Sequence, residues 1–152
     1  MSITIVEFSI EEYDKAVLLW NLSEGIGLSN ADSKSNIHYY LDRNPGMSFV
    51  AYDNDMLVGA VLCGHDGRRG YIHHLAVHPD SRSQGIGRML AEKCLAALNS
   101  IGIQKSHLFI FNDNQMGIDF WKKLGWIQRF DISVLSKPLK STRWKPSVFN
   151  MN

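Results

Sequence analysis

The chain has 152 residues, 45% of them hydrophobic and 20% charged, a balance typical of one globular domain with a buried core. Its formal net charge of +1 argues against broad nucleic-acid binding, which requires a concentrated basic surface. No stretch approaches the length of a membrane span, and no apolar N-terminal run follows a basic patch, so we expect a cytoplasmic protein without membrane contact.

The first half of the chain is predicted to form a strand, two helices and an antiparallel hairpin. Apolar residues spaced by three and four favour the helices, and β-branched runs favour the strands. A loop with two glycines separates the helices, and Asn44-Pro45-Gly46 ends the second one. The predicted elements are a strand at residues 3–8, helices at 10–22 and 32–41, and hairpin strands at 48–52 and 57–63.

Residues 71–98 are predicted to form a buried strand, a basic turn that contains glycine, and an amphipathic helix. The strand ends at His78-Pro79, because proline cannot continue a ladder of hydrogen bonds. The helix begins within the pattern Arg82-x-x-Gly85-x-Gly87. Its apolar face is formed by Ile86, Met89, Leu90, Cys94, Ala97 and Leu98.

The turn at residues 82–88 has the composition of an anion-binding site. Gly85 and Gly87 lack a Cβ, so an anion can approach the unpaired backbone N–H groups of the first helical turn, where the helix dipole also favours negative charge. The turn matches neither a P-loop nor a Rossmann fingerprint. From the glycines alone, a pyrophosphate site and an ordinary helix N-terminus are both consistent interpretations.

The last third of the chain is predicted to contain three further strands and one helix. Residues 106–111 are apolar on both faces, which favours a central strand. A helix is expected at 114–124, followed by final strands at 126–130 and 132–135 with a short turn between them. The predicted single domain spans residues 1–137, and residues 138–152 form a tail without clear periodicity.

Both cysteines are predicted to be buried thiols. Cys63 falls in a predicted strand and Cys94 in a predicted helix, without the CxxC spacing of a metal or redox pair. We therefore expect two reduced core thiols and no bound metal ion.

Two segments resemble motifs of the GCN5-related N-acetyltransferases, the GNAT superfamily. Residues 75–90, LAVHPDSRSQGIGRML, resemble the strand, turn and helix that bind acyl-CoA in that family. Residues 112–126, NDNQMGIDFWKKLGW, resemble a segment with an asparagine, a short helix and a Leu-Gly-aromatic ending. The resemblance implies an α/β (α+β) GNAT fold, with a mixed, mostly antiparallel sheet of about seven strands, flanked by about four helices and splayed between the fourth and fifth strands.

The resemblance also implies a site for acetyl-CoA as co-substrate. The pantetheine arm is expected between the splayed strands, and the pyrophosphate at the turn before the helix. The residues that match the family's cofactor contacts are Leu75, Ala76, Val77, Arg82, Ser83, Gln84, Gly85, Ile86, Gly87, Arg88, Asn114 and Trp121.

For catalysis, the resemblance points to the Leu75 amide as the donor to the thioester carbonyl and to His73 as a base acting through water. The alternative for His73 is a hydrogen-bonded packing role. His73 and His74 are adjacent, so strand alternation predicts that they point to opposite faces. Trp121 replaces the tyrosine that protonates the leaving thiolate in many relatives, and an indole is no acid near neutral pH. Tyr71, water or the product ammonium then remain as proton sources.

Two further positions concern the acceptor. Glu24 falls in the loop that lines the acceptor side in relatives, where it either meets the substrate amine or stays a solvated carboxylate. Phe109 stands where some relatives that acetylate protein N-termini carry a glutamate base.

These features predict an N-acetyltransferase that transfers an acetyl group from acetyl-CoA to a primary amine of a small molecule or protein. Direct attack in a ternary complex is expected, because neither cysteine lies in the motifs. The alternative is a catalytically weak sensor or interaction module that binds acetyl-CoA, which the replacement at Trp121 favours. A homodimer is also compatible with the resemblance, since many relatives dimerise through their final strands.

Overall fold

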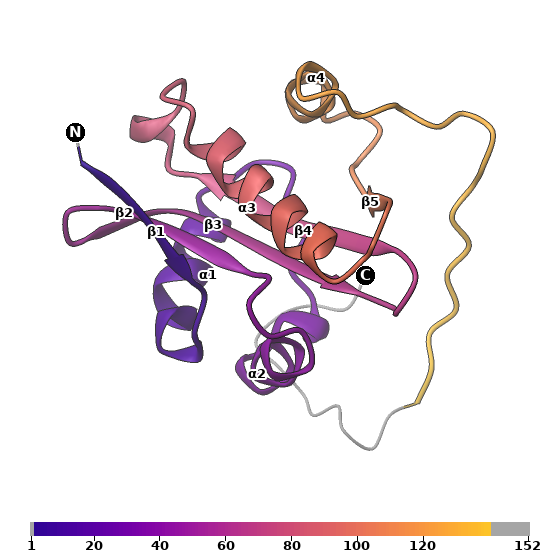
Figure 1. The fold of residues 1–152 in the computed structure, drawn as a ribbon, viewed down its shortest axis with the longest axis horizontal. Coiled ribbons are helices and arrows are strands. Elements are labelled where there is room, and N and C mark those ends of the chain that lie inside the picture. The colour runs from indigo at the N-terminus through magenta and orange to yellow at the C-terminus, as the bar shows by residue number, and fades with distance from the viewer. Residues whose placement is uncertain (1, 141–152) are drawn as a thin grey trace.

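The computed structural model describes residues 2–140, so residues 141–152 of the predicted tail lie outside the described range. Five strands and four α-helices follow one another along these residues (Figure 1). The strands are β1 (Ile3–Glu7), β2 (Phe49–Asp53), β3 (Met56–His65), β4 (Gly70–Val77) and β5 (Ser106–Leu108). The helices are α1 (Tyr13–Asn21), α2 (Lys34–Arg43), α3 (Ile86–Ser100) and α4 (Gln115–Lys123).

The strands form one sheet in the order β1-β2-β3-β4-β5. Neighbours from β1 to β4 pair antiparallel, and β5 pairs parallel to β4. The predicted mixed, mostly antiparallel sheet with four helices is therefore confirmed. None of the described helices is both long and apolar enough to cross a membrane.

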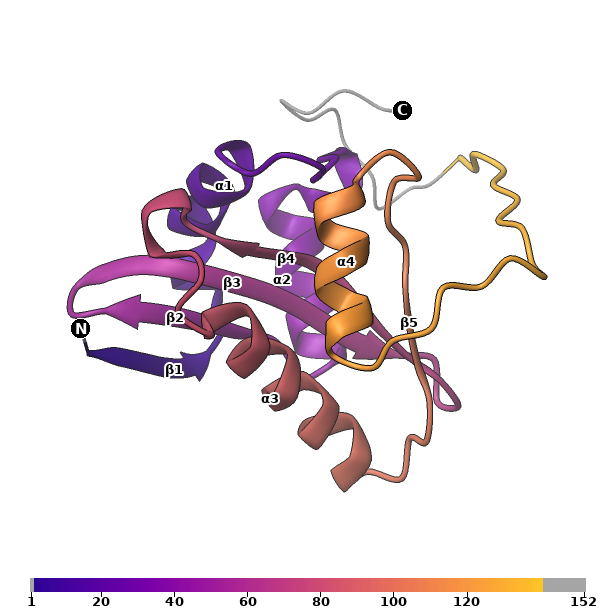
Figure 2. The ribbon, with the colours of Figure 1, turned by 90° about the horizontal axis from the view of Figure 1, so that it is seen from above.

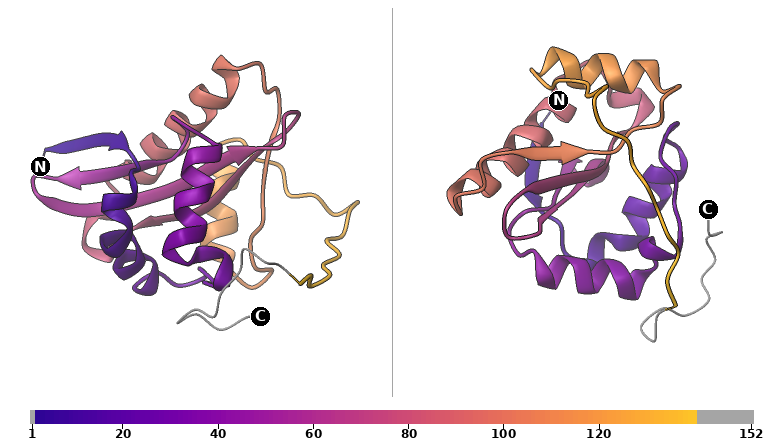
Figure 3. Two further views of the ribbon diagram at one scale, coloured as in Figure 1. Left: turned by 90° about the horizontal axis from the view of Figure 1, so that it is seen from below. Right: turned by 90° about the vertical axis from the view of Figure 1, so that its right-hand side faces the viewer.

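Helices cover both faces of the sheet, α1 and α2 on one face and α3 on the other (Figures 1 and 2). The core on the α3 face includes Ile86, Leu90 and Leu98, and the core on the opposite face includes Leu19 and Trp20. Strand β3 is buried from Leu57 to Gly64 because both layers pack on it. Helix α4 joins the α3 layer, on the opposite side of the sheet from α2 (Figure 3, right).

The two cysteines are free and buried, as predicted. Cys63 lies on β3 and Cys94 on α3, within one core cluster. The neighbouring Cys63 thiol and burial raise the pKa of the Cys94 thiol. Cys94 is therefore a protonated packing residue and not a nucleophile.

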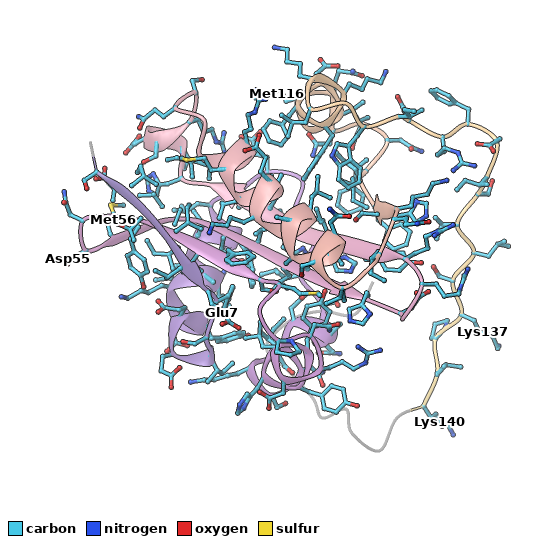
Figure 4. All side chains as sticks on the ribbon, in the orientation of Figure 1. Glu7, Asp55, Met56, Met116, Lys137 and Lys140 are labelled. Carbon is cyan, nitrogen blue, oxygen red and sulfur yellow. The ribbon has the colours of Figure 1, made fainter. Side chains whose placement is uncertain are left out.

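The sheet has five strands in residues 2–140, and the prediction of about seven is wrong by its last two. Residues 126–135 form no helix or strand within the described chain. The predicted strands leave only Asp131 between them, whereas the tightest hairpin loops contain two residues. The chain instead runs outward to Lys137 and Lys140 (Figure 4), with Ile127 and Phe130 each 83% exposed.

Strand β5 is shorter than predicted and lies at the edge of the sheet, not at its centre. It ends at Leu108, and the following Phe109 and Phe111 are largely exposed. Residues that are apolar on both faces are typical of a central strand, but here the chain leaves β4 before these residues can pair.

Candidate functional site

Strands β4 and β5 separate after a short paired section. The last pair joins Ile72 to Leu108, whereas β4 continues to Val77. Within the described chain, residues 73–77 of β4 therefore have no strand partner on the β5 side, which confirms the predicted splay between the fourth and fifth strands. We call these residues the β4 edge. An extended ligand with its own amide groups can pair with such an edge as an added strand does.

A β-bulge interrupts the β4 edge at His74. On β3, Leu62 pairs with His73 and Ala60 with Ala76, so one β3 residue stands opposite two residues of β4. The φ angle of His74 is 53°, a left-handed conformation that costs on the order of 1–3 kcal/mol for a residue other than glycine. Regular alternation of side chains is lost at this point.

The bulge turns both histidines toward the α1 and α2 layer. The His73 ring lies 6.3 Å from the Tyr40 ring on α2, and the His74 ring lies 5.3 Å from the Trp20 ring on α1. The two imidazole centroids are 6.4 Å apart. The prediction that they point to opposite faces is therefore wrong, because it assumed a strand without a bulge.

His74 is hydrogen-bonded through both its ring and its backbone. Its Nε2 lies 2.9 Å from Oδ1 of Asp32, and the two side chains are 19% and 9% exposed. Its carbonyl oxygen accepts a 2.8 Å hydrogen bond from the Trp20 indole. The sequence places Asp32 only at the start of a predicted helix, and no local signal reveals a partner 42 residues away.

Asp32 is held by further contacts in the turn before α2. Its Oδ2 accepts a hydrogen bond from the Ser29 backbone N–H at 3.1 Å, and the Tyr13 hydroxyl donates to its carbonyl oxygen at 2.6 Å. Ser29 in turn accepts a hydrogen bond from the Ala31 N–H. The carboxylate that faces His74 therefore has a fixed position.

His73 lies in an aromatic environment. Its ring is 6.3 Å from that of Phe109 and 6.3 Å from that of Tyr40. Burial lowers its pKa, and the neighbouring His74 lowers it further. Tyr71, also on β4, has its ring 6.4 Å from that of Phe109.

The basic turn follows the β4 edge after His78 and one turn of 3-10 helix at Pro79–Ser81. Gly85, with φ of 81°, precedes the first residue of α3, and no side chain caps that helix within the described residues. Ser83, Gln84 and Gly85 are exposed. The Arg82 Nε donates to the Val77 carbonyl at 3.1 Å, so this guanidinium lies beside the end of β4. The first turn of α3 therefore offers free N–H groups next to a cation.

Gly87 also has a packing role. It is buried, and a Cβ on it would lie 3.0 Å from Cζ of Phe120 on α4. The absence of a side chain therefore lets α4 approach the start of α3. Arg88, the next residue, is exposed and pairs with Glu92 at 2.9 Å.

Asn114 and Trp121 have structural contacts. Oδ1 of Asn114 accepts the Gly117 N–H at 3.0 Å and caps α4, and a Cβ on Gly25 would lie 2.5 Å from the Asn114 Nδ2. The loop after α1 therefore touches the start of α4. Trp121 is buried, with its ring 5.0 Å from that of Trp126. Glu24 is exposed beside Gly25.

Most of the predicted site residues thus lie along residues 71–88, whereas Glu24, Asn114 and Trp121 come from other parts of the chain. The β4 edge, the basic turn and the start of α3 follow one another along the chain, with a short 3-10 helix between the edge and the turn, and both histidines lie on the edge. Asn114 approaches from α4, whereas the Trp121 ring is in the core. No cluster of three or more metal-ligating side chains occurs within residues 2–140.

Comparison with known proteins gives consistent matches. Residues 15–126 match the Acetyltransferase (GNAT) family. An acetyltransferase of Pectobacterium atrosepticum is 32% identical over 136 residues, which cover 90% of this chain and 95% of that protein.

Solved structures match as well. Ard1 from Thermoplasma volcanium has a TM-score of 0.74 at 21% identity, covering 84% of each chain. The PaiA N-acetyltransferase from Thermoplasma acidophilum, solved in complex with coenzyme A, has a TM-score of 0.73 at 20% identity, covering 82% of this chain and 89% of that one. At this identity, the two likenesses establish the fold.

Proposed function

Because this chain belongs to the GNAT family of acetyltransferases, we propose that it transfers the acetyl group of acetyl-CoA to a primary amine by direct attack in a ternary complex. The observation that carries the proposal is the unpaired β4 edge, which leads through the basic turn to an uncapped helix α3. An edge with free amides suits the pantetheine arm, and a helix N-terminus suits the pyrophosphate.

The residues of both features fit acetyl-CoA as co-substrate. The backbone of Leu75, Ala76 and Val77 would pair with the amide-bearing arm. The turn would hold the phosphates through its exposed N–H groups and the Arg82 charge. Asn114 is the proposed contact from α4. Acetyl-CoA supplies the activated thioester carbonyl. The further proposed phosphate contacts are Ser83, Gln84, Gly85, Ile86, Gly87 and Arg88.

The reaction then needs few side chains. The amine nitrogen bonds to the thioester carbon, the C–S bond breaks, and the Leu75 N–H donates to the carbonyl oxygen as charge develops there. The acceptor must lose a proton, and we assign its removal to the pair of histidines on the bulge, of which the family motif singles out His73. Tyr71 is the proposed proton donor to the departing thiolate, because the Trp121 indole is buried and is not an acid.

Two further assignments concern the surroundings of the site. Residues 1–137 form the proposed acetyltransferase domain, with Glu24 on the acceptor side. A homodimer through residues 126–135 is supported by the exposed apolar side chains of that segment.

The test is an amine screen with two readouts. Wild-type protein is incubated with acetyl-CoA and a polyamine, an amino-acid amide, a peptide with a free N-terminus or a lysine peptide, while thiol release and product mass are followed. At least one amine should give thiol and acetylated product in equal amounts. Acetyl-CoA binding without turnover of any amine would favour the sensor alternative.

A further inference from the structure

We propose that His74, and not its neighbour His73, accepts the proton of the acceptor amine, and that Asp32 is the positioning residue that orients it. This inference rests on the proposed acetyl transfer and names the residue that performs its proton step. It follows from the contacts of the two histidines on the bulge.

The contact with Asp32 fixes the tautomer of His74. An ionised carboxylate only accepts hydrogen bonds, so the 2.9 Å contact between Asp32 Oδ1 and His74 Nε2 places the ring proton on Nε2. Nδ1 then carries the free lone pair. The other Asp32 oxygen accepts the Ser29 N–H, so the carboxylate cannot turn away without losing a hydrogen bond.

His74 also lies next to the proposed donor to the thioester carbonyl. His74 directly precedes Leu75, whose N–H is the proposed donor to the thioester carbonyl. The bulge at His74 has a φ of 53°, and the Trp20 indole holds its carbonyl. Strained backbone of this kind persists where the surrounding contacts determine it, and it recurs at catalytic sites. The same bulge brings His74 and Asp32 together.

The surroundings of His73 do not suit the role of proton acceptor. Its ring is bordered by the Tyr40 and Phe109 rings, and no carboxylate contacts it within residues 2–140. No hydrogen bond from a side chain of residues 2–140 fixes its tautomer, and the Asp32 carboxylate, which contacts His74, acts on His73 only through its charge. The pKa of His73 is lowered by burial, which also opposes proton uptake.

The proton balance is complete. An alkylammonium acceptor gives one proton to His74 Nδ1, the neutral amine forms the N–C bond, and the C–S bond breaks. Two protons leave the nitrogen in all. One ends on the coenzyme A sulfur and the other leaves to solvent from His74.

The groups that face His74 allow a pH test. They are Asp32 from the turn before α2, His73 on β4 and Tyr13 on α1, which contacts Asp32. Burial raises the pKa of Tyr13 to about 12, so Tyr13 stays neutral over the assay range. A base at His74 and a purely structural His74 then predict different pH profiles.

The experiment compares His74→Gln with the matched variant His73→Gln, using the fastest amine from the screen. His74→Gln should lower kcat about 100-fold near neutral pH and leave the Kd for acetyl-CoA unchanged. The loss should shrink as the pH approaches the amine's own pKa of about 10, because solvent then supplies neutral amine. His73→Gln should lower kcat less than His74→Gln does at neutral pH. The activity control is His38→Gln on α2, whose exposed side chain lies outside the site and whose kcat should stay within about threefold of wild type.

Two measurements keep the inference testable if a variant fails to fold. Asp32→Asn should lower kcat about tenfold without changing the Kd for acetyl-CoA. Long-range ¹H–¹⁵N spectra of the wild-type protein should show the His74 proton on Nε2.

Three results would overturn the assignment: a kcat for His74→Gln within threefold of wild type, an equal loss at every pH, or a proton on Nδ1. If the wild type binds acetyl-CoA but turns over no amine, the proposed function fails and the assignment fails with it.

Discussion

The Trp20 indole donates a 2.8 Å hydrogen bond to the carbonyl oxygen of His74, 54 residues further along the chain. Trp20 is only 1% exposed, so this bond joins the interior of the α1 layer to the bulge in β4. A buried carbonyl without a partner costs about 1–3 kcal/mol. Helix α1 therefore helps to hold the conformation on which the proposed proton acceptor depends.

The variant Trp20→Phe tests this relationship. It keeps an aromatic ring but removes the donor, so the free energy of unfolding should fall by at least about 1–3 kcal/mol, as measured by urea denaturation. It should also lower kcat, because the bulge can relax. The matched change Trp126→Phe removes an indole that makes no hydrogen bond in the described chain, and it should leave kcat unchanged. Equal kcat losses in both variants would contradict the proposed role.

A charge in the basic turn should weaken cofactor binding. Gln84 is exposed in the turn, and Gln84→Glu adds a carboxylate with almost no change of shape. Repulsion of the pyrophosphate should raise the Kd for acetyl-CoA about tenfold, equivalent to about 1.4 kcal/mol, in a calorimetric titration at low salt. Gln104→Glu makes the same change beyond the far end of α3 and should have no effect. Identical Kd values for the two variants would place the phosphates elsewhere.

The stability of the protein should depend on pH through His73. Burial lowers its pKa below the ordinary value of 6.5, so the unfolded chain binds the proton more readily than the folded one. This contribution is complete above the unfolded pKa and is lost as the pH falls toward the folded pKa. The free energy of unfolding should therefore drop as the pH falls below about 6.5, and drop less in His73→Gln.

The control for this pH effect is His38→Gln. His38 lies on α2 with a side chain that is 56% exposed, so its replacement should leave the pH dependence of the wild type in place. If His73→Gln has the same pH dependence as the wild type, the buried imidazole is not the group responsible.

The exposed segment at residues 126–135 should form an interface between two copies. Burying a large apolar side chain contributes about 1.5–3 kcal/mol, and Ile127 and Phe130 are both available for burial. Light scattering after size exclusion should give a dimer for the wild type and a monomer for the double variant Ile127→Glu, Phe130→Glu. Lys137→Glu, two residues beyond this segment, should remain dimeric. A monomeric wild type would refute the interface.

Much of the fold could be predicted because its signals are local. The helix that became α3 shows its apolar spacing within a few residues, and the Arg82-x-x-Gly85-x-Gly87 turn is contiguous in the chain. The order of strands and helices follows from such segments one at a time. The prediction of the splay between β4 and β5 rested on the family resemblance and not on periodicity.

The parts that sequence reasoning missed depend on contacts between distant residues. Whether His73 and His74 share a face depends on pairing with β3, which strand alternation cannot reveal. The Asp32 contact joins the turn before α2 to His74 on β4, and the whole β2–β3 hairpin lies between them in the chain. The prediction of the two final strands is wrong for a related reason. An apolar pattern shows that residues 126–135 are able to pair, but not that the sheet has a free strand edge for them to pair with.

Amide hydrogen exchange at the β4 edge and at the start of α3 tests the central proposal most directly. Acetyl-CoA should slow exchange at Leu75 and Val77 and also at the first turn of α3, whereas ADP, which lacks the pantetheine arm, should slow exchange only at the turn. Equal protection by both ligands, or none at the β4 edge, would contradict binding of the thioester arm along β4.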